Sequence, residues 1–356
     1  MLTYCRRKQS QLFTGPTPGL FYKIHKQEFF EMSTLKDVAE KSGVTVTTVS
    51  RMLNGRGYIS EKTRAKINEA MRELNYKPNE LARALSKKRS NFIGLIVPSA
   101  SNMYFCKVID CVEHLVTGSG YKLLLCTSND ETKKELEYFN MLSASKVAGV
   151  ILASHTQNID LSVAIDAPII SIDRIISPRI PSVCSDNYQG GVLAAEHLIA
   201  KGCRKLAHIS GSSYLNMEAN KRFFGFKEVC EKRGVPYVAV DATEEQFLSM
   251  RYENIINSLI DSHPDIDGIF TSNDIIAAQV IKICSKRGIR IPQQMKVVGY
   301  DDIDLCKFCT PSITTIHQPV RDICQRAVES IVMGRDKKAI PTSVTFPVTL
   351  VEREST

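Results

Sequence analysis

Four polar side chains follow apolar, strand-like runs of the sequence at the point where each run ends. They are Ser99 after FIGLIVP (92–98), Asp173 in PIISIDR (168–174), Asn273 in DGIFTSN (267–273) and Asp301 in KVVGYDD (296–302). In an open sheet of parallel strands, the carboxyl ends meet along one edge, which is where ligands bind. Hydroxyl, amide and carboxylate groups at that edge can exchange hydrogen bonds with a small polar ligand. An acid there can instead cap the next helix, and we expect this role for Asp186 and Asp274.

Apolar runs alternate with helix-period segments from Asn91 onwards, and this alternation must position those side chains. Strands are predicted at 92–98, 122–128, 149–154, 168–174, 182–187, 205–211, 236–240, 267–273 and 296–302, and helices at 103–116, 131–145, 190–200, 222–233, 244–261 and 274–286. Nearly continuous apolar strands between helices specify parallel sheets covered on both faces. So many units exceed one ordinary open sheet, and we predict two doubly wound lobes. An eight-fold barrel is the main alternative, but the strand-like tail 343–354 after a helix at 320–334 argues against it.

The segment from Thr34 to Ser90 has a different period and predicts three short helices. In the first, Leu35, Val38 and Ala39 share one face behind Ser33 or Thr34 as N-cap, and Gly43 ends it in the left-handed conformation. Thr45 caps the second helix, with an apolar side formed by Val49, Met52 and Leu53 and an outer side formed by Val46, Thr47, Ser50 and Arg51. Ser60 caps the third, with apolar residues Ile67, Ala70, Met71 and Leu74 and a limit at Pro78.

Two helices joined by a glycine turn are typical of the helix-turn-helix, whose second helix enters the DNA major groove. A plain helical hairpin is the alternative, but three helices sharing one core favour the DNA-binding motif. The charge distribution agrees with it. Residues 1–90 hold 18 Lys and Arg against 8 Asp and Glu, whereas the remainder holds 28 against 30. The basic surplus therefore belongs to the first part of the chain, as a phosphate-binding module requires.

Several function classes are disfavoured by what the sequence does not contain. No GxGxxG turn follows a strand, which argues against a dinucleotide-dependent enzyme. The eleven cysteines show no disulfide-like spacing, and the CxxC of Cys306 and Cys309 has no second ligand pair. There is no signal peptide, and no apolar run reaches the roughly 18 residues of a membrane span. We expect a cytoplasmic protein without catalytic residues, cofactor, metal or membrane association. We also expect Met32 to be the natural start, with 1–31 a disordered leader or mis-called start.

Specific motifs now identify a resemblance. The first part reads TLKDVA, GVTVTTVSR, LN, SEKTR, LNYKPN and ARAL, and the second contains IGLIVP, SDNYQGG, RFFGF, FTSNDIIAAQ, VVGYDDI and PSITTIHQP. Over about residues 33 to 356 the chain resembles the lactose-repressor family of bacterial transcription factors. Its nearest relatives look like Gram-positive regulators of sucrose or related sugar operons. A solute-binding protein would instead need an export signal and no DNA-binding module.

The resemblance implies a helix-turn-helix headpiece (32–78), a hinge helix (79–90) and a two-lobed effector-binding and dimerisation core (91–356) that is similar to periplasmic binding proteins. The implied DNA contacts are Thr34, Thr45, Val46, Thr47, Ser50, Arg51, Asn54, Tyr58, Asn79, Ala82, Arg83 and Leu85. The implied effector contacts are Ser99, Tyr104, Phe105, Asp173, Arg222, Asn273 and Asp301, a set suited to the vicinal hydroxyls of a sugar or sugar phosphate. The expected partners are double-stranded operator DNA, that effector and a second copy in a homodimer. A catabolite regulator with a phosphocarrier protein as corepressor is the runner-up.

The hinge segment carries one prediction of its own. Asn79 to Arg89 is too short to be stable as an isolated helix in water, so we expect DNA and the partner subunit to order it. Leu85 is then available to wedge between base pairs in the minor groove and kink the duplex. The alternative is that Leu81 and Leu85 pack on the core. Leu85→Ala should strongly reduce specific operator affinity and DNA bending while salt-dependent non-specific binding persists. Unchanged bending in a circular-permutation assay would favour the packing role.

Overall fold

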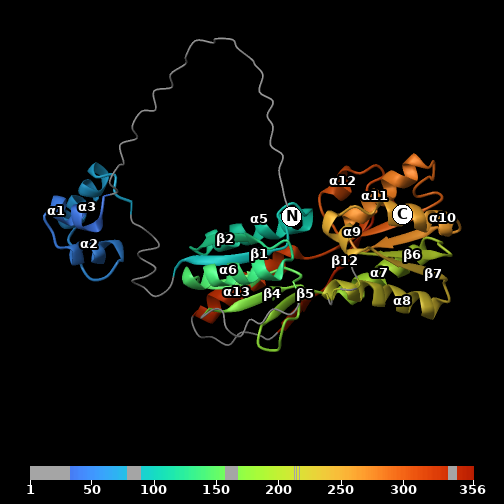
Figure 1. Cartoon of the computed structure of the whole chain (residues 1–356), viewed down its shortest axis with the longest axis horizontal. Helices are drawn as coiled ribbons and strands as arrows, with labels where there is room; N and C mark the ends of the chain where they lie inside the picture. Colours follow the sequence, from blue (N-terminus) through green and yellow to red (C-terminus); the bar gives the residue numbers. More distant parts are fainter. Residues whose placement is uncertain are drawn as a thin grey trace, which may run out of the picture. The chain divides into compact units, whose positions relative to one another are not determined.

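The chain divides into two compact units, residues 1–78 and 79–356, in a computed structural model (Figure 1). The structure describes residues 33–77, 90–156, 167–211, 213, 215, 217–335 and 343–356. The leader and the hinge residues Asn79, Ala82, Arg83 and Leu85 lie outside these ranges. Each unit is described by itself below.

The first unit is a three-helix headpiece around a small apolar core. Its helices are α1 (Leu35–Ser42), α2 (Val46–Leu53) and α3 (Glu61–Glu73). The predicted N-caps are confirmed, since the hydroxyls of Thr34, Thr45 and Ser60 each accept a backbone N–H of the following turn. Gly43 ends α1 at φ 67°, as predicted. α3 ends several residues earlier than the limit predicted at Pro78. The shared core consists of Val38, Ala39, Val49, Ile67 and Ala70.

The second unit contains two α/β lobes, and the first lobe is built on a six-stranded sheet of order β11-β5-β4-β3-β1-β2. Every neighbouring pair in this sheet is parallel. Its elements are β1 (Phe92–Val97), α5 (Met103–Gly118), β2 (Lys122–Thr127), α6 (Thr132–Ala144), β3 (Gly149–Leu152), β4 (Ile169–Ile172), β5 (Ser182–Ser185), α13 (Val320–Arg335) and β11 (Ser343–Phe346). β1 packs on both faces: Leu95 belongs to the core that includes α5 and α13, and Ile96 to the core beneath α6.

The second lobe is built on a six-stranded sheet of order β12-β10-β9-β8-β6-β7, in which β12 is antiparallel to β10. Its elements are α7 (Asn187–Ala200), β6 (Leu206–Ser210), the 3₁₀ turn η2 (Glu218–Asn220), α8 (Lys221–Arg233), β7 (Tyr237–Asp241), α9 (Glu244–Ser249), α10 (Glu253–Ser262), β8 (Gly268–Thr271), α11 (Asp274–Lys286), β9 (Lys296–Asp301), α12 (Leu305–Phe308), β10 (Thr314–His317) and β12 (Thr349–Val351). Figure 1 shows the two lobes side by side, joined by segments that cross between them. The predicted pair of doubly wound lobes is confirmed, and the barrel is excluded.

Three predictions about individual elements are wrong in detail. The helix predicted at 244–261 is two helices, because the chain turns left-handed at Met250 (φ 53°). The side chain of Gln279 in α11 hydrogen-bonds to the backbone at this break. It donates to Met250 O and accepts from Tyr252 N–H, both at 2.9 Å. The tail 343–354 splits at Pro347 into β11 and β12, which belong to different sheets. β10 was not predicted as a strand.

The chain crosses between the lobes at three places: after β5, after β10, and between β11 and β12. Two of these crossings are bonded to each other, because Asp186 N–H donates to Phe346 O (2.8 Å). Asp186 also caps α7 as predicted, its carboxylate accepting Gln189 N–H at 2.9 Å. The crossings thus form a narrow inter-lobe hinge beside the carboxyl ends of both sheets, distinct from the hinge helix predicted at 79–90.

Two glycines allow α7 and α8 to pack with their backbones in contact. A Cβ built on Gly191 would lie 1.9 Å from Arg222 O, and one built on Gly225 would lie 2.0 Å from Tyr188 O. Any side chain at either position therefore pushes the two helices apart, and α8 carries Arg222 near its start. These glycines belong to the SDNYQGG and RFFGF motifs. The close contact of the two helices explains why each motif contains glycine.

We predict that Gly225→Ala destabilises the core by about 1–3 kcal/mol, the usual cost of overpacking, because the added methyl group meets backbone rather than a mobile side chain. Gly118→Ala is the matched control: it lies at the end of α5 with open space around its Cβ position. The control should change stability by less than about 0.5 kcal/mol. Urea unfolding followed by circular dichroism measures both, and equal effects would contradict the helix-contact argument.

Candidate functional site

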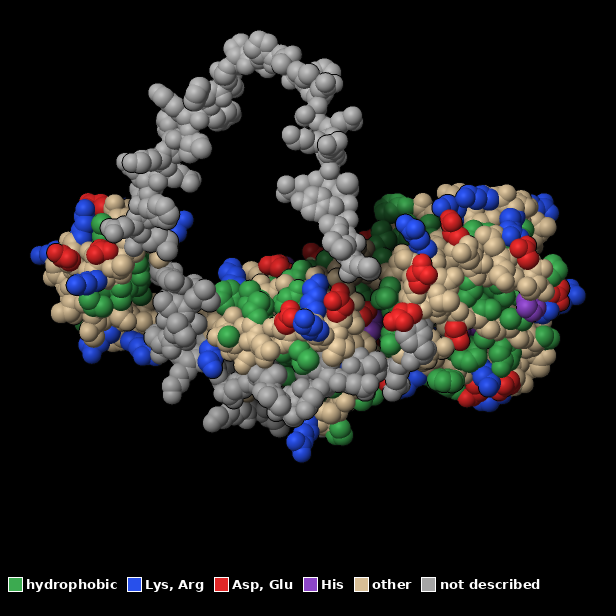
Figure 2. All heavy atoms as spheres, viewed as in Figure 1, with side chains coloured by type: hydrophobic (Ala, Val, Ile, Leu, Met, Phe, Trp, Pro, Cys, Tyr) green, Lys and Arg blue, Asp and Glu red, His purple; other side chains and the backbone are tan. Residues whose placement is uncertain are grey.

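The headpiece presents a polar face on α2 that points away from its core. Val46 is 43% exposed, Thr47 and Arg51 are exposed, and Tyr58 beyond the helix is 96% exposed. Val46, Thr47 and Arg51 belong to the outer side predicted for the second helix, and Tyr58 is among the DNA contacts that the resemblance implies. All four side chains are exposed. Residues 33–77 carry nine Lys and Arg against five Asp and Glu. Figure 2 shows Lys and Arg side chains in blue around this unit.

Other residues predicted to contact DNA form hydrogen bonds within the headpiece. Thr34 forms a capping box with Asp37, and Thr45 pairs with Thr48 at 2.9 Å between hydroxyls. Asn54 is half-buried at the end of α2, where its amide donates to Ser50 O (2.8 Å) and to the Ser50 hydroxyl (3.3 Å). Thr34 thus stabilises the start of α1, and Thr45 and Asn54 stabilise the two ends of α2.

The core holds a cavity at the carboxyl ends of both sheets, where the two lobes face each other. Six of the seven predicted effector contacts line it: Tyr104, Phe105, Asp173, Arg222, Asn273 and Asp301. They come from the ends of β4, β8 and β9 and from the starts of α5 and α8. Ser99 does not line this cavity; it lines a neighbouring hollow instead. Its hydroxyl accepts the backbone N–H of Ser101 (3.1 Å), and this turn leads the chain into α5.

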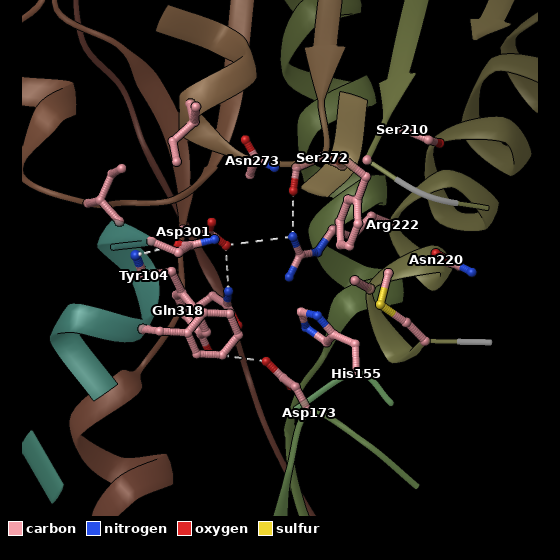
Figure 3. Close-up of a pocket in the computed structure, with 18 of the residues that line it drawn as sticks. Tyr104, His155, Asp173, Ser210, Asn220, Arg222, Ser272, Asn273, Asp301 and Gln318 are labelled. Atoms are coloured by element: carbon pink, nitrogen blue, oxygen red, sulfur yellow. Dashed lines mark hydrogen bonds and ion pairs between the residues drawn. The ribbon is translucent and has the colours of Figure 1, made fainter. Parts of the chain in front are cut away.

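Arg222 stands at the centre of the cavity wall (Figure 3). Its guanidinium is 3.6 Å from Asp301 Oδ1, donates to Ser272 O, and donates through Nε to Asn187 Oδ1 at 2.8 Å. The guanidinium also lies over the Tyr300 ring, 3.6 Å from its centroid. Only 6% of the residue is exposed, and a charge at this depth is stable only with such partners.

Asp301 carries backbone strain and a perturbed acidity. Its φ of 107° is rare for a residue with a side chain, and strain of this kind concentrates at functional sites. Gln318 Nε2 donates to its Oδ1 at 2.7 Å. Burial raises the pKa of Asp301 to about 8, although Arg222 acts in the opposite direction. The cavity thus holds a carboxyl group whose charge depends on pH near neutrality.

Asp173 faces this pair from the first lobe. Its Oδ2 accepts the Tyr104 hydroxyl (3.1 Å), and its Oδ1 accepts Ser185 N–H (2.9 Å). The residue has φ 50°, again in the left-handed region. Burial raises the pKa of Asp173, while the Ser185 N–H and the Arg222 charge limit that rise. Asp173 also raises the pKa of the Tyr104 phenol, after burial as the main cause.

The capping role predicted for Asp274 is wrong. Asn273, not Asp274, caps α11: its Oδ1 accepts Ile276 N–H at 2.9 Å. Asp274 is instead fully buried at the first helical position, where it accepts the Thr315 hydroxyl and Ile303 N–H. Burial raises the pKa of Asp274 to about 6. Asp274 is therefore a structural acid, and Asn273 combines capping with a place on the cavity wall.

Sequence reasoning missed several polar groups in the cavity. Among the described residues, Ser272 Oγ and His208 Nδ1 are buried and have no hydrogen-bond partner within the protein. Burial lowers the pKa of His208 to about 3, so this imidazole is neutral at physiological pH. Gln318 was missed as well, although IHQP follows a β-branched run that could have indicated a strand end. The other missed polar lining residues are Asn102, His155, Ser210 and Asn220.

Across the described ranges, no group of three or more His, Cys, Asp and Glu side chains is placed to hold a metal ion. The helices in these ranges are too short or too polar to cross a bilayer. The cavity chemistry is that of hydrogen bonding to a polar ligand.

A helix-turn-helix unit followed by a two-lobed α/β core with a polar cavity between its lobes defines a class of ligand-binding regulatory proteins. The family model for bacterial regulatory proteins of the lacI family matches residues 34–79. A model of the periplasmic binding protein-like domain matches residues 195–356. The chain belongs to the lacI family of bacterial regulatory proteins.

Named relatives share the whole architecture. The ribose operon repressor of Halalkalibacterium halodurans is 37% identical over 91% of this chain and 97% of its own length. The sucrose operon repressor of Streptococcus mutans is also 37% identical, over 91% of this chain and 99% of its own length. A solved lac repressor dimer bound to operator and the anti-inducer ONPF has a TM-score of 0.81 at 25% identity, with 91% of this chain and 99% of that chain covered.

The acidity of Asp301 predicts a pH-dependent stability. The folded state holds this proton up to about pH 8, whereas an unfolded carboxyl releases it near 3.8. The free energy of unfolding therefore falls as pH rises between these values, by up to about 1.4 kcal/mol per pH unit from this group. Asp301→Asn should flatten the slope between pH 5 and 8 in urea titrations.

Asp304→Asn is the matched control, because the Asp304 carboxylate is 69% exposed and its pKa is lowered by Lys107 and Lys307, with Lys307 the main partner. This group titrates below pH 4 in both states, so its loss should leave the slope between pH 5 and 8 unchanged. If Asp301→Asn kept the wild-type slope, the assignment of this pH dependence to the Asp301 carboxyl group would be contradicted.

Proposed function

We propose that this protein is a sequence-specific DNA-binding repressor of a carbohydrate-utilisation operon, and that a small sugar in the core cavity switches its affinity for the operator. The observation that carries the proposal is the combination of an exposed reading face on α2 with a buried Arg222–Asp301–Asp173 cavity. Both named relatives are operon repressors for sugars.

Recognition of DNA rests on the outer face of α2, from Val46 at its start to Arg51 in its last turn. In a helix-turn-helix, side chains near the start of the second helix reach base edges in the major groove. Val46 offers a contact for a thymine methyl group, and Arg51 can donate two hydrogen bonds to one guanine. The basic surplus of the headpiece supplies the phosphate contacts, which carry affinity without sequence information.

The charge of the cavity favours a neutral sugar over a sugar phosphate. Two carboxyl groups face a single guanidinium, and His208 is neutral at physiological pH. Arg222 is already occupied by Asp301 and Ser272 O. Burial raises the pKa values of Asp173 and Asp301 because negative charge is costly at this site, and a phosphoryl group would add negative charge beside both, whereas sugar hydroxyls can hydrogen-bond to both. The aromatic rings of Tyr104 and Phe105 provide surfaces for the C–H face of the sugar.

The cavity is connected to the hinge by hydrogen bonds. Gln318 lies at the crossing after β10 and donates to Asp301, while its Oε1 accepts the hydroxyl of Ser185 (2.6 Å) at the end of β5. Lys107 of the first lobe also donates to Asp302 O of the second lobe (2.7 Å). A sugar that competes for Asp301 changes these contacts, and so it can favour one lobe arrangement over another. Differential binding to two arrangements is the requirement for a switch.

The remaining parts of the proposal follow from the family. Two headpieces of a homodimer would read a pseudo-palindromic operator, since protein and DNA symmetry then match. Asn79, Ala82, Arg83 and Leu85 of the hinge helix would contact the minor groove between the two half-sites. Regulation of transcription places the protein in the cytoplasm and requires no catalytic residue.

Operator selection tests this function. The purified chain should enrich a pseudo-palindromic duplex from a random pool. Arg51→Gln should reduce the preference for that duplex over a single-base variant by about 1–3 kcal/mol, as measured by fluorescence anisotropy. Arg72→Gln is the matched control, because Arg72 is an exposed arginine on α3 that pairs with Glu69 at 2.8 Å. The control should keep the preference. Failure to enrich any sequence would contradict the proposed function. Equal losses of preference for both variants would contradict the assignment of Arg51 as a base-contacting residue.

A further inference from the structure

A second hollow adjoins the cavity that Arg222 and Asp301 line. The two hollows share six wall residues: Asn102, Phe105, His155, Phe247, Asn273 and Ile275. The free volume is about 120 Å³ in the inner cavity and about 410 Å³ in the outer hollow. The outer hollow is therefore continuous with the inner cavity along this shared wall and is the larger of the two.

The shared wall is aromatic and joins the two lobes. The His155 ring lies 5.5 Å from the Phe105 ring of the first lobe and 6.0 Å from the Phe247 ring of the second, measured between centroids. Asp130 holds His155 in place: Asp130 Oδ1 accepts His155 N–H at 2.9 Å, and Oδ2 is 3.5 Å from the ring Nδ1. A ligand that passes this wall can place apolar ring faces against it on both sides.

The far side of the outer hollow is polar and acidic toward the first lobe. Ser99, Asn129, Asp130 and Glu131 line it, together with Leu248, Met250 and Tyr252 of the second lobe. Asn129 and Asp130 are both left-handed, at φ 54° and 57°. The turn is held by Asn129 N–H, which donates to Pro98 O at 2.8 Å. Hydroxyl, amide and carboxylate groups opposite an apolar wall are the surroundings that a second sugar ring requires.

We propose that the outer hollow is a second sugar subsite, and that the effector is a neutral disaccharide with one ring beside Arg222 and Asp301 and the other against Phe247 and Asn129. The proposal rests on the proposed function, because it extends the same cavity. The carboxylates of Asp130 and Glu131 oppose a phosphoryl group on the second ring, so the disaccharide is unphosphorylated. Burial raises the pKa of Asp130, but the bonds from His155 outweigh this effect and hold the pKa below its usual value. Asp130 is therefore charged at neutral pH.

Two monosaccharide explanations are less consistent with this geometry. A single ring beside Arg222 leaves the polar wall around Asn129 without a ligand. A single ring in the outer hollow leaves the buried Ser272 hydroxyl and His208 Nδ1 of the inner cavity without the partners that burial demands. A disaccharide reaches both walls at once, and its second ring would lie beside Ser99 and Asn129.

Calorimetric titration of the full-length protein tests the subsite directly. The panel comprises sucrose, maltose and trehalose, the monosaccharides glucose, fructose and ribose, and sucrose 6-phosphate. At least one neutral disaccharide should bind ten times or more tightly than every monosaccharide, and the phosphate should bind weakly. If a monosaccharide binds as tightly as every disaccharide, the outer subsite is wrong while the proposed function stands. If no sugar binds, the proposed effector class and the subsite fail together.

Leu248→Trp separates the two subsites. Leu248 is 55% exposed and lines only the outer hollow. Because the chain contains no tryptophan, the new indole both narrows that hollow and reports on it by fluorescence. The variant should weaken disaccharide binding at least tenfold and keep monosaccharide affinity within twofold, which also shows that it is folded. Ser249→Trp, on the same helix but outside the hollow, should bind both classes like the wild type. Equal weakening of both classes by Leu248→Trp would overturn the proposal.

Discussion

The buried charge of Arg222 is the constraint on which the core depends. A guanidinium that is 6% exposed must be hydrogen-bonded and paired, or the fold loses several kcal/mol. Its partners come from separate parts of the second lobe: Asn187 at the start of α7, Ser272 after β8 and Asp301 after β9. The close contact of α7 and α8 through Gly191 and Gly225 delivers Arg222 to this position. The close packing of α7 on α8 therefore determines both the charge pairing of Arg222 and the geometry of the cavity.

A chain of hydrogen bonds continues from that charge across the hinge. Asp301 accepts from Gln318, Gln318 accepts from the Ser185 hydroxyl, and the Ser185 N–H donates to Asp173 in the first lobe. The two cavity carboxyl groups are thus connected through two of the three crossing segments. A ligand that replaces one partner of Asp301 disturbs the connection between the lobes as well as the local contact. In this account, effector binding and hinge geometry are coupled because they use the same polar atoms.

Local signals in the sequence predicted the headpiece and the order of elements well. Thr45 before a helix and Gly43 after one are determined by short-range hydrogen bonding and backbone geometry, so they can be read without tertiary context. The break at Met250 could not be predicted in this way, since Gln279, 29 residues away in the sequence, satisfies its polar groups. The cap predicted at Asp274 was wrong for a similar reason, because the burial of Asp274 against Thr315 depends on the tertiary structure.

The cavity was predictable in outline and not in detail. Strand-end topology located Asp173, Asn273 and Asp301, and family resemblance added Tyr104, Phe105 and Arg222. The sequence does not mark Ser272 and His208, whose importance lies in burial, whereas Gln318 follows a β-branched run that could have indicated a strand end. Ser99 follows the strand-end rule but lines the outer hollow, because the rule identifies an edge of the sheet and not a particular cavity along it.

The most direct test of the account is operator affinity with and without a saturating sugar, measured by fluorescence anisotropy for the wild type and Asp301→Ala. The sugar is one shown by calorimetry to bind the wild-type protein. The account predicts that it changes wild-type operator affinity about tenfold or more, a coupling of at least roughly 1.4 kcal/mol. Asp301→Ala should bind operator like the sugar-free wild type and show no response. A full response in Asp301→Ala would contradict the claim that this carboxyl group connects the cavity to the hinge.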